Sequence, residues 1–127
     1  MLLEEDFKIK QIENAALVSI VCPSFEFHKT EEETERSLGE LKELLRTLGL
    51  NTEGVYIQNK KQVEAATMIG TGKLLEIAEE AKAKNVKLLV FDFELTGRQI
   101  KNIKDLTKID VVDRNHIILE IFSKHAT

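Results

Sequence analysis

Four stretches of the chain are apolar over several consecutive positions, the pattern of β-strands that are buried on both faces. The longest covers residues 15–22, contains several β-branched side chains and is ended by Pro23. The clearest of the others covers residues 86–91, and shorter ones cover residues 54–58 and 109–112. These four stretches predict four strands.

Between these stretches, apolar residues recur at the three- and four-residue spacing of an amphipathic helix. A leucine stripe over positions 38–48 ends at Gly49, a residue suited to the left-handed C-cap of a helix. Thr30–Glu33 and Thr96–Gln99 match the capping box, in which two side chains satisfy the free amides at a helix start. Helices are therefore predicted after both boxes, and a third is predicted over residues 73–84.

Strands that alternate with such helices predict an α/β fold, with a single-domain, mainly parallel sheet and helices on both faces. Residues 65–69 are expected to be a further extended segment. Residues 113–115 are expected to turn the chain into the apolar segment 116–122. Because no long linker or repeat interrupts this pattern, residues 1–127 are predicted to form one domain.

Composition narrows the class of protein. Hydrophobic residues make up 43% of the 127 residues, and 18 basic against 22 acidic side chains give a net charge of −4. Residues 1–64 carry 8 basic and 13 acidic side chains and residues 65–127 carry 10 and 9, so neither half is the basic stripe of a protein held by nucleic-acid phosphates. The acidic start, Met1–Asp6, is unlike a signal peptide, and no apolar run is long enough to span a membrane. With a single cysteine, Cys22, the chain is expected to be a reduced, cytoplasmic protein.

The segment Gly70-Thr71-Gly72-Lys73 precedes a predicted helix and is a candidate anion-binding loop. Glycines let backbone amides converge on an anion, and a lysine adds positive charge at the helix N-terminus. A complete P-loop would need glycine at Thr67 and a hydroxyl residue at Leu74, so we do not expect nucleotide hydrolysis. Two interpretations stay open: a tight turn that starts the helix, or a cradle for a nucleotide or RNA phosphate.

Charged residues follow two of the predicted strands, at the edge where ligands approach parallel sheets. Asp92 and Glu94 are carboxylates at a strand end, where a receiver domain keeps its phosphoacceptor, but residues 22–25 lack the acidic pair that would bind magnesium there, so a capping role is favoured. Asp113 and Arg114 are either an exposed recognition pair or a buried ion pair that shapes the last turn. The three histidines lie far apart in the sequence, and no metal site is predicted.

A series of short motifs runs through residues 37–126 in a fixed order. They are the helix Leu41–Leu48, Val55–Gln58, Ile69–Lys73, Leu89–Asp92, Glu94-Leu95, Gln99 with Asn102, and Val111–Phe122. Together they resemble the N-terminal domain of the HflX family of ribosome-associated GTPases. The resemblance is weaker at residues 122–126, where Phe-Ser-Lys-His-Ala stands in place of the family's usual Phe-x-x-Arg-Ala.

The resemblance implies a cytoplasmic, non-catalytic domain that binds the large ribosomal subunit and its rRNA. It also implies regulation of an attached GTPase domain in proteins that act on stalled or stressed ribosomes. GTP and magnesium are implied only for that downstream domain, because residues 59–62 are not the guanine-reading Asn-Lys-x-Asp and no other GTPase motif is present. The acidic pI of about 5.5 predicts weak ribosome binding by this chain alone. Two alternatives stay open: an ATP-binding α/β domain that uses residues 70–73, and a homodimerising interaction module.

Overall fold

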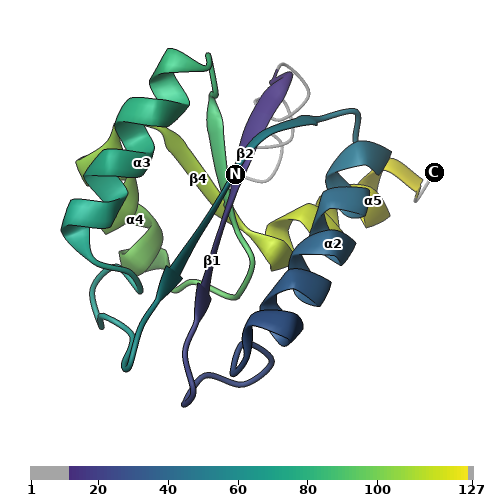
Figure 1. Ribbon diagram of the computed structural model, residues 1–127. Helices are drawn as coiled ribbons and strands as arrows, with labels where there is room; N and C mark the ends of the chain where they lie inside the picture. Colours follow the sequence, from purple (N-terminus) through teal and green to yellow (C-terminus); the bar gives the residue numbers. More distant parts are fainter. Residues whose placement is uncertain (1–11, 126–127) are drawn as a thin grey trace.

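The computed structural model describes residues 12–125, and the acidic start Met1–Asp6 lies outside this range (Figure 1). Strands and helices alternate along the described residues. In chain order they are β1 (Asn14–Val21), α2 (Glu31–Thr47), β2 (Asn51–Asn59), α3 (Thr71–Ala83), β3 (Leu88–Phe91), α4 (Gly97–Thr107), β4 (Asp110–Asp113) and α5 (Arg114–His125). In this part of the chain, each helix is too short or too polar to cross a membrane.

The four strands form one parallel sheet in the order β2-β1-β3-β4. The chain therefore moves outward from β1 to β2, then returns to the other side of β1 with β3 and continues to β4. All carboxyl ends of the strands lie at one edge of the sheet, and the order reverses between β1 and β3. In open α/β sheets, this reversal point is where ligands bind.

Helices cover both faces of the sheet, which confirms the predicted α/β fold: α3 and α4 cover one face, and α2 and α5 cover the other (Figure 1). The side chains of β1 alternate between the two cores. Val18 and Ile20 pack among residues of α3 and α4, whereas Leu17 packs against the leucine stripe of α2 and Ile117 of α5. Each of these β1 side chains is fully buried, which explains why the sequence of β1 is apolar at nearly every position.

The predicted capping boxes form to different extents. Thr96 is the N-cap of α4, and the reciprocal hydrogen bonds between Thr96 and Gln99 are both present. The Thr30 side chain accepts from the amide of Glu33 as expected, but Glu33 accepts from the amide of Lys29 at 2.8 Å. In the first box, the Glu33 side chain therefore binds the amide of the residue before the N-cap and not the amide of Thr30.

The expectation of an extended segment over residues 65–69 is wrong. These residues form a tight turn closed by an antiparallel bridge between Glu64 and Met68, and Met68 has a positive φ of 69°. Met68 and Ile69 are nonetheless buried in the core beneath α3 and α4. Their hydrophobicity reflects this burial in a turn, which the apolar pattern alone does not distinguish from a strand.

Candidate functional site

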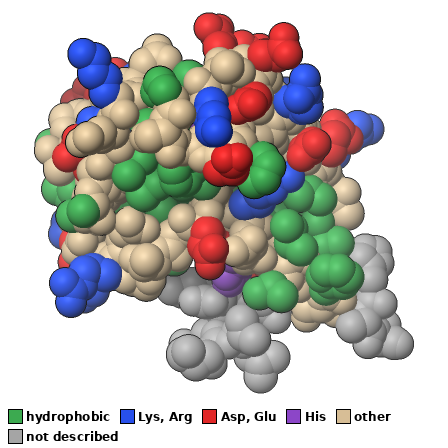
Figure 2. Space-filling model, turned by 90° about the horizontal axis from the view of Figure 1, so that it is seen from below, with side chains coloured by type: hydrophobic (Ala, Val, Ile, Leu, Met, Phe, Trp, Pro, Cys, Tyr) green, Lys and Arg blue, Asp and Glu red, His purple; other side chains and the backbone are tan. Residues whose placement is uncertain are grey.

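A cavity of about 630 Å³ lies at the carboxyl edge of the sheet, where the strand order reverses. The loop after β1, the first three turns of α2, the residues after β3 and the start of α5 all contribute to its wall. Figure 2 views the molecule from this edge, where acidic and basic side chains are mixed and hydrophobic patches lie between them. Sheet topology and side-chain geometry thus indicate the same place as a candidate ligand site.

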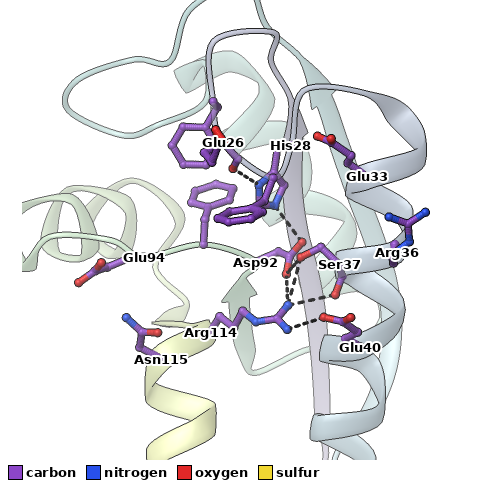
Figure 3. Close-up of a pocket in the computed structure, with 13 residues that line it drawn as sticks. Glu26, His28, Glu33, Arg36, Ser37, Glu40, Asp92, Glu94, Arg114 and Asn115 are labelled. Atoms are coloured by element: carbon purple, nitrogen blue, oxygen red, sulfur yellow. Dashed lines mark hydrogen bonds and ion pairs between the residues drawn. The ribbon is translucent and has the colours of Figure 1, made fainter.

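Asp92 is the centre of a hydrogen-bond network beside this cavity (Figure 3). Its Oδ2 accepts from Ser19 Oγ at 3.3 Å and lies 3.1 Å from Nε2 of His28. Its Oδ1 accepts from Ser37 Oγ at 2.9 Å and from Nη1 of Arg114 at 3.0 Å. The carboxylate is fully buried, so its charge is stabilised by these four donors and not by water.

Arg114 connects α5 to α2. Besides Asp92, its Nη1 donates to the carbonyl and the hydroxyl of Ser37, and its Nη2 donates to Glu40 Oε1 at 2.9 Å. The planar guanidinium suits this arrangement because it can donate to several acceptors in fixed directions. Among the described residues, Arg114 therefore pairs with the buried Asp92 and the exposed Glu40, and not with Asp113; its own side chain is 23% exposed.

His28 joins the loop after β1 to Asp92. Its Nδ1 lies 3.3 Å from the carbonyl oxygen of Glu26, and its Nε2 faces the Asp92 carboxylate. Because both neighbours are acceptors, only the imidazolium can donate to both at once. Burial disfavours the charge and lowers the pKa of His28, but the hydrogen bonds to Asp92 and Glu26 outweigh burial and raise the pKa above its ordinary value of 6.5.

Asp113, the last residue of β4, holds two backbone amides. Its Oδ2 accepts from the amide of Leu95, and its Oδ1 accepts from the amide of His116 in the first turn of α5. One carboxylate thus fixes the loop after β3 and caps α5. Glu94, the other candidate acid of that loop, is exposed on the cavity wall.

The segment Gly70-Thr71-Gly72-Lys73 forms the N-terminus of α3, on the face of the sheet opposite to α2 and α5, and it does not line the cavity. The amide of Gly70 donates to Oε1 of Gln58, and Nζ of Lys73 lies 3.4 Å from Glu76. Thr71 and Gly72 are exposed. The structure therefore brings Asp92 and Arg114 together, and keeps residues 70–73 apart from them.

Sequence reasoning missed the contributions of His28, Ser37 and Glu40. The backbone amide of Cys22 donates to the carbonyl of His28 and closes the loop that presents this histidine. The only local signal was a histidine in a phenylalanine-containing loop after a buried strand. Among the side chains that the structure describes, residues 12–123, no group of three or more histidine, cysteine or acidic side chains is arranged to hold a metal ion.

Comparison with known proteins assigns the family. The family model described as GTP-binding GTPase N-terminal matches residues 35–123. The chain belongs to this family. The matched range agrees closely with residues 37–126, over which the motifs resemble the HflX N-terminal domain, so the predicted HflX relationship is confirmed.

The curated relatives are named GTPase HflX. The protein from Caldanaerobacter subterraneus subsp. tengcongensis is 40% identical over 114 residues, which are 90% of this chain and 25% of the relative. The Escherichia coli protein is 31% identical over 97 residues, which are 76% of this chain and 23% of the relative. The chain thus spans about a quarter of the length of the HflX proteins that it matches.

Solved structures show the same fold. A crystal structure of SsGBP in complex with GDP has a TM-score of 0.63 and 21% identity, over 90% of this chain and 30% of that chain. A variant of SsGBP has a TM-score of 0.66 and 22% identity, over 91% of this chain and 33% of that chain. These similarities support the α/β architecture of the HflX-type N-terminal domain.

Proposed function

We propose that this chain is a non-catalytic N-terminal domain that contacts the rRNA of the large ribosomal subunit and regulates the GTPase domain of an HflX-type protein. The observation that carries this proposal is the family match over residues 35–123, together with relatives named as GTPases of which the chain covers about a quarter. The GTPase activity, with its GTP and magnesium, belongs to the rest of such a protein.

The strand-end carboxylates support a non-catalytic role. Asp92 is surrounded by four side-chain donors, and Asp113 accepts from two backbone amides. A general base or phosphoacceptor needs an oxygen that can reach its substrate. Both carboxylates instead connect segments of the fold, which is a structural role.

The N-terminus of α3 is the proposed phosphate contact. The first amides of a helix have no intrahelical acceptor and lie at the positive end of its dipole. Because the amide of Gly70 is bonded to Gln58, the contact would use the amides of Thr71, Gly72 and Lys73 together with the lysine ammonium. The net charge of −4 and the mixed charges in Figure 2 support a weak contact.

Co-sedimentation with purified large subunits at about 50 and 150 mM salt tests this proposal, since phosphate contacts weaken steeply over this range. We expect weak binding that falls with salt and falls further in the Lys73→Ala variant. Lys82→Ala is the matched control, because Lys82 is exposed in the last turn of the same helix. Tight, salt-insensitive binding would contradict a weak phosphate contact, and equal effects of the two variants would remove Lys73 from it.

ATP is the alternative ligand for the same helix start, because its phosphates would meet the same amides and the Lys73 ammonium. Calorimetry with ATP, with and without magnesium, distinguishes this alternative. Magnesium-dependent binding that Lys73→Ala abolishes would favour a nucleotide-binding domain. Absence of a heat signal in both proteins would exclude it.

A further inference from the structure

The cavity beside Asp92 has the size and position of a small-ligand site. Its volume of about 630 Å³ falls within the roughly 300–1,000 Å³ that small-molecule sites occupy. It lies at the reversal point of the sheet, away from the N-terminus of α3 that the proposed rRNA contact uses. A ligand bound here would therefore occupy a different place from that contact.

The charges of the cavity wall favour a cation. Five carboxylates line it, against two guanidinium groups and the imidazole of His28. Arg114 already donates to Asp92 and Glu40, so its charge is neutralised within the wall. Arg36 lies 3.5 Å from Glu32 and points away from Asp92 in Figure 3. An anion would therefore meet an excess of negative charge, whereas a cation would reduce it.

Glu94 is a carboxylate of the cavity wall whose charge is not compensated within the described part of the chain. It is exposed, and among the described residues it has no ion-pair partner. In Figure 3, Glu94 and Asn115 lie on one side of the pair formed by Asp92 and Arg114, with Glu33 on the other side. Glu33 and Glu94 thus contribute to the cavity wall on opposite sides of this pair.

Aromatic side chains supply the second element of cation recognition. Phe25 packs edge-on against Phe93, with ring centroids 5.3 Å apart, and both line the cavity. Phe27 lines it too, although its side chain is 75% exposed and its φ is 69°. Because this ring is exposed and lines the cavity, it is accessible to a ligand. The faces of such rings attract cations.

We propose that this cavity binds a small organic cation with a primary ammonium group on an alkyl stem. The ammonium group would bind between the aromatic rings and the carboxylates, with Glu94 as one acceptor, and the stem would contact the phenylalanine side chains. This site adds a small-molecule ligand to the domain and does not depend on ribosome binding.

The test is an NMR titration of the 127-residue chain with butane-1,4-diamine, with butane-1,4-diol as a ligand of the same length and no charge. We expect shift changes from the diamine at residues 25–28, 92–94 and 114–115, and none from the diol. Equal effects of the two ligands, or diamine shifts spread over acidic residues of the whole surface, would overturn the proposal.

Variants locate the site. Phe27→Gly removes the ring and places glycine where φ is positive, so the fold should be kept. Combined with Glu94→Gln, it should weaken diamine binding about tenfold, as expected for one cation–π contact and one carboxylate. Glu94→Gln alone, which changes an exposed side chain, should weaken it about threefold.

Glu79→Gln is the matched control, because Glu79 is an exposed glutamate of α3, outside the cavity. It should leave diamine affinity within about twofold of the unmodified chain. Unchanged affinity in both cavity variants, or a loss in Glu79→Gln as large as theirs, would overturn the assignment.

Discussion

Arg114, the first residue of α5, donates from Nη1 to Oδ1 of Asp92 at 3.0 Å, just after the end of β3. The Asp92 carboxylate is fully buried, so each partner depends on the other for the compensation of its charge. The same guanidinium reaches Ser37 and Glu40 of α2. This pair therefore fixes the start of α5 against α2 and the sheet, and it forms part of the cavity wall.

Replacing Asp92 by asparagine should strongly destabilise the domain. The change removes the charge that compensates Arg114 and His28 while keeping the size of the side chain. Loss of one partner of a buried pair costs about 3–5 kcal/mol, so the free energy of unfolding in urea should fall by about that amount.

Asp105→Asn is the control for this substitution. Asp105 is exposed and pairs with Lys101 at 3.0 Å, and the hydrogen bond from Lys101 lowers its pKa. Because water solvates both of these groups, the substitution should hardly change the unfolding free energy. If the two variants unfold at the same urea concentration, the Asp92 network does not stabilise the fold.

Arg114→Lys tests the geometry of the network separately from its charge. A lysine has one nitrogen and cannot donate to Asp92 and Glu40 in the directions that a guanidinium provides. We expect a loss of about 1–3 kcal/mol in thermal or urea unfolding, from hydrogen bonds to charged groups. Arg36→Lys, at an exposed pair with Glu32, should change stability by less than about 0.5 kcal/mol. If Arg114→Lys changes stability as little as Arg36→Lys does, the charge of Arg114 matters and the geometry of its guanidinium does not.

The elements of this fold could be predicted because their signals are local. The apolar run of β1, the leucine stripe of α2 and the capping box at Thr96 each reflect contacts within one element or with one layer. The sequence predicts β2 only over residues 54–58, whereas the strand covers residues 51–59. It is an edge strand whose residues alternate in exposure, so only its central part has an apolar sequence.

The cavity could not be predicted because its residues are far apart in the sequence. His28 and Asp92 are 64 positions apart, and Arg114 and Ser37 are 77 apart. Their proximity depends on the strand order, which places β1 beside β3. Asp92 and Arg114 stood out because they follow strands, whereas the histidine and the α2 residues had no such positional signal.

Two glycines of the α2 region should respond in opposite directions to alanine. Gly49 has a φ of +84° after the C-cap, a region that alanine adopts at a cost, so Gly49→Ala should destabilise the domain by about 1 kcal/mol. Gly39 is exposed in the middle of α2, and a Cβ there would meet no atom within 4 Å. Gly39→Ala should therefore stabilise the domain by about 0.5–1 kcal/mol. Thermal unfolding of both variants checks this, and a shift in the same direction would contradict it.

His28 should make the stability of the domain depend on pH near neutrality. Its hydrogen bonds to Asp92 and Glu26 raise its pKa in the folded state above 6.5, its ordinary value, despite the opposing effect of burial. The folded state therefore holds the proton more tightly than the unfolded state does, and stability from this group is fully present below pH 6.5. It is lost as the pH rises through the folded-state pKa.

Urea unfolding between about pH 5.5 and 8.5 should show stability that falls with rising pH, and His28→Gln should remove this component of the slope because glutamine does not titrate. If stability depends on pH equally in the wild type and the variant, the imidazolium is not the form that binds Asp92. The same conclusion would follow if His28 made the domain more stable as the pH rises.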